Sequence, residues 1–68
     1  MLTAEQCFVH IETLSKTADK KAFELAVAYI DQVAPSDIGQ LRDKVREFPG
    51  SKFISEVLDI LDARAKRT

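Results

Sequence analysis

The residues that could do nucleophilic chemistry are a cysteine and a histidine near the start of the chain, Cys7 and His10. Side chains three residues apart on a helix are neighbours, and a thiolate beside an imidazole is the arrangement that a cysteine nucleophile uses. The surrounding pattern favours a structural role instead. Cys7 falls in an apolar stripe, where cysteine packs as a small hydrophobic residue, while His10 points toward the polar side. We therefore predict no catalytic residue here.

Metal and cofactor sites are not predicted either. A zinc site requires three or four closely spaced ligands, and one cysteine and one histidine supply only two of the preferred kind. The P-loop, GxSxG and HExxH motifs do not occur in the sequence. We therefore expect a protein that is not an enzyme, that holds no cofactor and that has no small-molecule substrate.

A strip of carboxylates is the second candidate functional site in the sequence. Glu56, Asp59 and Asp62 recur every three residues, so a helix would place them along one side. Such a strip could attract a basic partner or supply an acid–base pair. Because its neighbours on that side are polar, we interpret it as a solvated helix face.

The third candidate functional site is a possible DNA-binding unit in the middle of the chain, indicated by the spacing of its apolar residues. It resembles the apolar positions of bacterial helix-turn-helix regulators, in which the second of two helices enters the major groove of DNA. The residues that carry this resemblance are Val27, Ala28, Val33, Ile38 and Leu41. The resemblance implies base or phosphate contacts from four polar residues that follow: Gln40, Arg42, Lys44 and Arg46.

Two positions depart from that motif. Asp31 stands where such motifs have an apolar residue, and Gln32 stands where they favour glycine. Acidic residues also offset the basic ones on the same predicted helix: Asp37, Asp43 and Glu47. Since phosphate contacts supply most non-specific affinity for DNA, DNA-binding regulation is the second of our two functional hypotheses.

The composition indicates one small globular domain. The 68 residues carry ten basic and eleven acidic side chains, well mixed, for a net charge of −1. This balance gives no strong electrostatic footprint for nucleic acid or for an anionic membrane. One cysteine cannot form an internal disulfide, which indicates a reducing compartment. With no signal peptide and no apolar run of about 18 residues, we expect a cytoplasmic protein of a bacterial or phage-like kind.

Four helical segments position these residues. Thr3 and Gln6 form a capping box ahead of a first helix whose apolar stripe recurs every three or four residues: Ala4, Cys7, Phe8, Ile11 and Leu14. A second helix follows, capped by Ser15 or Thr17, and stops by Ala34 because proline disfavours helix in the residue before it.

Two further helices complete the predicted fold. The third starts at a cap on Ser36 or Asp37 and runs to about Phe48. After the break at residues 49–50, Ser51 caps a fourth helix over residues 52–66. Four helices with short turns predict an all-α, compact four-helix single domain spanning residues 1–68.

We place the second helix, residues 18–34, at the centre of this domain. Its apolar residues cover more than half of the helix circumference, and a helix that is apolar on several sides needs several neighbours. Those residues are Ala22, Phe23, Leu25, Ala26, Val27, Tyr29, Ile30, Val33 and Ala34.

Recognition of another protein is the leading functional hypothesis, in the manner of a small adaptor, chaperone, inhibitor or immunity-type partner. A domain this small has a marginal core, so a partner or a second copy is a natural source of stability. Five apolar residues at the edges or outside of the core stripes are the predicted contacts: Leu2, Val9, Phe53, Leu58 and Ile60. The wide apolar arc of the last helix has a simpler alternative, which is burial against two neighbouring helices of the same bundle.

Overall fold

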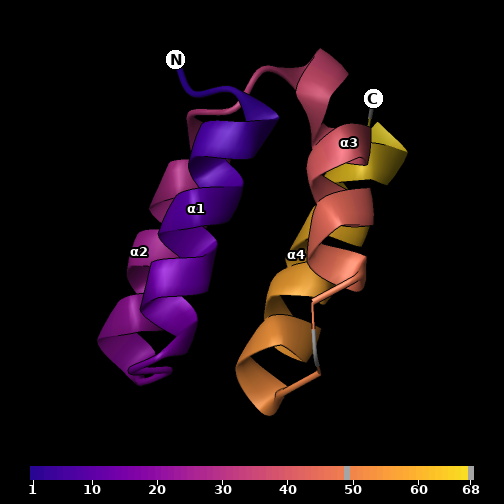
Figure 1. Ribbon diagram of the computed structural model, residues 1–68. Coiled ribbons are helices and arrows are strands. Elements are labelled where there is room, and N and C mark those ends of the chain that lie inside the picture. Colours follow the sequence, from indigo (N-terminus) through magenta and orange to yellow (C-terminus); the bar gives the residue numbers. More distant parts are fainter. Residues whose placement is uncertain (49, 68) are drawn as a thin grey trace.

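The computed structural model describes residues 1–48 and 50–67 and consists of four α-helices (Figure 1). They are α1 (Ala4–Ser15), α2 (Lys20–Asp31), α3 (Pro35–Arg46) and α4 (Lys52–Arg67). The predicted all-α, four-helix domain is confirmed. Within the described residues, no helix is long and apolar enough to cross a membrane.

The helices form two antiparallel hairpins that lie side by side, α1 with α2 and α3 with α4 (Figure 1). Across the two hairpins, α1 packs on α3 and α2 packs on α4, and both of these pairs run parallel. The helices α2 and α3 are consecutive in sequence but lie on a diagonal and contact each other only marginally. Each helix therefore has two principal neighbours, and the predicted central position of the second helix is not confirmed.

All four helices contribute buried side chains to one core. Its largest fully buried members are Ile11, Ile30, Leu41, Ile54, Leu61, Val45, Val57 and Cys7. Partly buried residues close the seams: Phe8 meets Phe48 between α1 and α3 edge to face, with ring centroids 6.1 Å apart. In the part of the chain that the structure describes, no polar or charged residue is buried as a whole.

The helix starts follow local side-chain chemistry. The capping box at α1 is confirmed, with Gln6 N–H donating to Thr3 Oγ1 and Thr3 N–H donating to Gln6 Oε1, both at 3.1 Å. The predicted cap of α4 is confirmed as well, because Ile54 N–H donates to Ser51 Oγ at 3.2 Å. Such caps satisfy amide groups that have no partner inside the helix.

The starts of the other two helices differ from the prediction. Asp19 caps α2 through a hydrogen bond from Ala22 N–H to its carboxylate at 2.7 Å, in place of Ser15 or Thr17. The reason lies one residue earlier, where Ala18 has a φ of 53° and turns the chain before the helix begins. The helix α3 begins at Pro35, ahead of Ser36 and Asp37, because proline fits the first helical position, where no amide donor is needed.

Candidate protein-binding surfaces

Burial makes the cysteine–histidine pair, Cys7 and His10, chemically unreactive. Cys7 is completely buried, and desolvation raises the pKa of its thiol from 9.0 to about 11. The His10 ring stacks on Tyr29 of α2, with centroids 4.2 Å apart and planes within 4° of parallel. A thiol that is buried and protonated is a poor nucleophile. Cys7 and His10 therefore contribute to the packing of the helices.

Acidic, cysteine and histidine side chains do not gather into a metal-binding group anywhere in residues 1–48 and 50–67. The carboxylates that recur along α4 have different surroundings. Asp62 lies 3.8 Å from both Arg42 and Arg46 of α3, whereas Glu56 and Asp59 face the seam between α4 and α2. The acidic strip is thus divided between two seams of α4.

The four residues proposed for DNA contact lie on α3. Gln40 and Arg46 are exposed, and Arg42 and Lys44 are partly buried. Arg42 and Arg46 both form ion pairs with Asp62 of α4, and these pairs partly neutralise the two arginines. In a helix-turn-helix unit the first helix supports the second across a tight turn, whereas α2 and α3 hardly touch. The geometry therefore does not favour the DNA-binding hypothesis.

The five predicted partner contacts fall in different environments. Val9 is exposed, with 53% of its surface accessible, on the outside of α1. Leu2 packs partly on the core and pairs with Val33, its N–H donating to Gln32 C=O at 2.8 Å. Leu58 is also partly buried against the core.

Phe53 requires a correction, because only 4% of its surface is accessible. It belongs to the core, since α4 packs against both α2 and α3 and buries most of its wide apolar arc there. Ile60 is partly buried, as Leu58 is, and it lines an open groove.

That groove lies between the start of α2 and the first half of α4 and has a volume of about 570 Å³. Its floor is apolar: Phe23 and Phe53 meet edge to face, with centroids 6.4 Å apart, and Ile60 extends the floor along α4. We call this site the α2/α4 groove. It is the feature of the described surface that best combines the predicted contact residues with a concave shape.

The rim of the α2/α4 groove is charged at both ends. Lys20 and Lys52 are the first residues of α2 and α4, and the parallel packing of these helices brings them to the same end (Figure 1). Glu56 and Asp59 follow one and two turns farther along α4. Asp19 also lines the end with the two lysines, so that end carries a net positive charge of one, and the other end is acidic.

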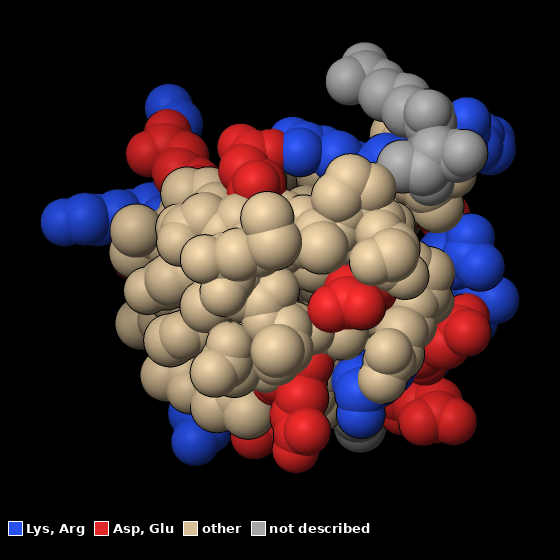
Figure 2. Space-filling model, turned by 90° about the horizontal axis from the view of Figure 1, so that it is seen from above, with Lys and Arg blue, Asp and Glu red and all other residues tan. Residues whose placement is uncertain are grey.

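A second groove, of about 560 Å³, lies at the opposite end of the bundle. Ile30, Val33, Pro35 and Ile38 line it, together with an ion pair between Asp31 of α2 and Arg64 of α4. Seen from this end, the molecule presents a broad uncharged surface with acidic and basic side chains mainly at its margin (Figure 2). The exposed Met1 forms one wall of this groove.

Comparisons with protein-family models, with curated proteins and with solved structures find no match to this chain. We therefore argue its function from its own geometry. Sequence reasoning selected Phe53 and Ile60 but missed Phe23 and the two lysines of the groove. The available signal was the amphipathic pattern of the second helix, whose Phe23 stands one turn after Lys20.

Proposed function

We propose that this chain is a non-enzymatic protein-binding domain and that the α2/α4 groove is its binding site. The observation that carries the proposal is an open groove with an aromatic and aliphatic floor and a rim charged at both ends. Buried aromatic anchors surrounded by polar residues are typical of protein interfaces. The setting that we propose is cytoplasmic, because the single cysteine is unpaired and fits a reducing compartment.

The partner that fits this groove is an amphipathic helix, laid with its apolar face on Phe23 and Ile60, which are supported from below by the buried Phe53. Its acidic end would meet Lys20 and Lys52, and its basic end would meet Glu56 and Asp59. The dipoles of α2 and α4 support the same polarity, because both helices begin at the basic end and favour negative charge there. A partner helix antiparallel to α2 and α4 would also place the negative C-terminal end of its own dipole there.

Ile60→Glu tests this proposal in a capture experiment from native lysate. A charge on the groove floor opposes apolar docking, so we expect the captured partner to fall at least about tenfold, as for loss of an interface anchor. Val9→Glu is the matched control, because Val9 is an exposed aliphatic residue on α1, outside the groove. Equal loss in both variants, or in neither, would contradict the assignment of the groove.

A further inference from the structure

The outer face of α2 is a second surface whose chemistry points to a partner. It comprises Lys21, Leu25, Ala28, Tyr29 and Gln32, of which all except Tyr29 are exposed. Leu25 has 43% of its surface accessible and is one of the large hydrophobic residues left exposed in the described structure. The helix α2 is apolar around more than half of its circumference, yet only α1 and α4 cover it substantially. The side of α2 with Leu25 and Ala28 at its centre and Lys21 and Gln32 at its ends is therefore left uncovered.

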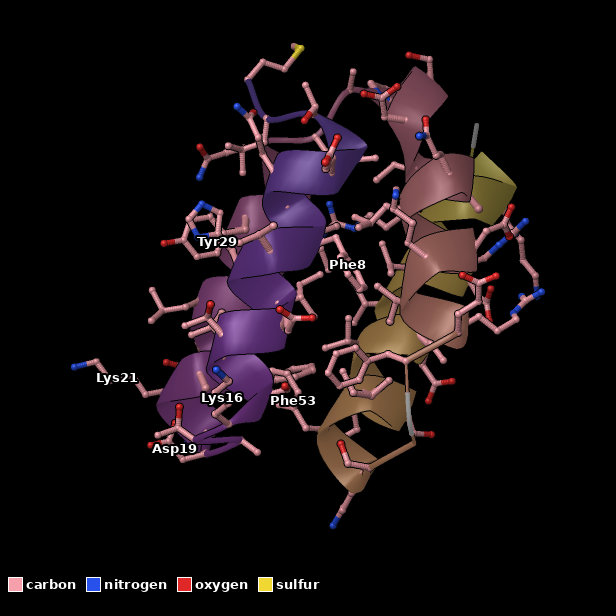
Figure 3. All side chains as sticks on the ribbon, viewed as in Figure 1. Phe8, Lys16, Asp19, Lys21, Tyr29 and Phe53 are labelled. Carbon is pink, nitrogen blue, oxygen red and sulfur yellow. The ribbon has the colours of Figure 1, made fainter. Side chains whose placement is uncertain are left out.

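The outer face of α2 is continuous along the helix. Lys21 and Tyr29 project from the same side of α2, away from α3 and α4 (Figure 3). Leu25 is one turn from each of them, since residues four apart share a helix face. The stack of His10 on Tyr29 fixes an aromatic margin beside this face. Tyrosine is among the residues enriched in protein interfaces.

We propose that a second copy of this chain packs on the outer face of α2, with the two α2 helices antiparallel. The sizes of the side chains favour this occupant. Leu25 and Ala28 are three residues apart, one large and one small. A two-fold axis between them sets Leu25 of each copy over Ala28 of the other, so each large side chain meets a small one.

The charges favour the same arrangement. Lys20 and Lys21 begin α2, and Asp31 ends it. In the antiparallel register, the basic start of α2 in one copy lies beside the acidic end of α2 in the other, with Lys21 opposite Gln32. The dipoles of the two antiparallel helices also attract each other. Asp31 itself pairs with Arg64 of its own chain. A net charge of −1 per chain opposes association very little.

Sedimentation of the purified full chain tests this proposal. We expect a reversible dimer that Leu25→Glu weakens at least about tenfold, because a charge replaces the central apolar contact. The control is Val9→Glu, which exchanges another exposed aliphatic residue for the same charge and should leave the dimer intact. Ala28→Leu is a second variant that keeps the surface apolar and should weaken the dimer by filling the space for Leu25.

Cysteine cross-linking tests the antiparallel register. A mixture of Lys21→Cys and Gln32→Cys chains should form a disulfide-linked pair under mild oxidation. Lys21→Cys alone should not, because the two copies of residue 21 would lie about 16 Å apart along the helices, beyond the reach of a disulfide. Cys7 is buried and does not interfere.

Three results would overturn the proposal: a wild-type monomer at every concentration tested, a dimer that survives Leu25→Glu, or efficient cross-linking of Lys21→Cys to itself. The outer face of α2 does not include Ile60, so Ile60→Glu should leave the dimer unchanged. A failure here is therefore distinguishable from a failure of the α2/α4 groove.

Discussion

At the scale of single residues, Cys7 shows how burial determines chemistry. Its spacing from His10 suits a nucleophile and base, but the thiol lies in the core, and burial raises its pKa to about 11. The sequence already placed Cys7 in an apolar stripe, and this assignment to the core is confirmed. The stacking of His10 on Tyr29 was not predictable, because it depends on the register of α1 against α2.

The raised pKa of Cys7 predicts a loss of stability in alkaline solution. The unfolded thiol releases its proton near its ordinary pKa of 9.0, whereas the folded thiol keeps it up to about 11. The unfolded state therefore binds fewer protons in this window, and the free energy of unfolding falls as pH rises through it. The full effect is about 2–3 kcal/mol.

Urea unfolding of wild type and Cys7→Ala between pH 8 and 11 measures this effect. Other groups titrate in both proteins, so the difference between their pH dependences isolates the thiol. We expect the wild type to lose more stability than the variant above about pH 9. Parallel pH profiles would contradict the prediction.

The left-handed backbone at Ala18 predicts a stabilising substitution. Its φ of 53° is costly for a residue with a Cβ and costs glycine little. Ala18→Gly should therefore raise the free energy of unfolding by about 1 kcal/mol, or the melting temperature by about 4–8 °C. Ala63→Gly is the matched control, because Ala63 is an exposed residue inside α4, where glycine should be destabilising. A loss of stability in Ala18→Gly would contradict this account.

At the scale of elements, the caps explain why some helix starts were predictable and others were not. The pairs Thr3–Gln6 and Ser51–Ile54 act within four residues, so the local sequence contains all that is needed. Before α2, three residues were able to cap: Ser15, Thr17 and Asp19. The turn at Ala18 selects Asp19, and an alanine gives no sequence signal for a positive φ.

The interior of α3 offers a second stabilising substitution. Gly39 lies within this helix, and a Cβ added there would meet nothing within 4 Å. Gly39→Ala should raise the free energy of unfolding by about 0.5–1 kcal/mol, because alanine has a smaller entropy cost in a helix. Thermal unfolding followed by circular dichroism measures the change. A lower melting temperature would show that Gly39 has a role other than helix formation.

At the scale of the whole molecule, the sequence predicted four helices but not their neighbours. The apolar width of the second helix indicated several contacts, and a periodic pattern does not say which helix makes them. The structure places α2 beside α1 and α4 and sets α3 on the diagonal. This arrangement buries Phe53, which the sequence pattern placed at the edge of its stripe, and leaves Leu25 exposed.

The α2/α4 groove is also a product of the whole molecule. Lys20 and Lys52 are more than thirty residues apart in sequence, and only the parallel packing of α2 on α4 brings them to one rim. Ile60 was selected because it stands at the edge of an apolar arc, and the structure places it in the groove. Its role in binding remains a prediction.

Titration calorimetry of a captured, purified partner against this chain tests the central claim most directly. Our account predicts that Ile60→Glu weakens binding at least about tenfold and that Lys52→Glu also weakens it, with a shallower salt dependence. Lys44→Glu, on α3 and outside the groove, should leave the affinity unchanged. An affinity that is the same for wild type, Ile60→Glu and Lys52→Glu would contradict the claim that the groove between α2 and α4 is the binding site.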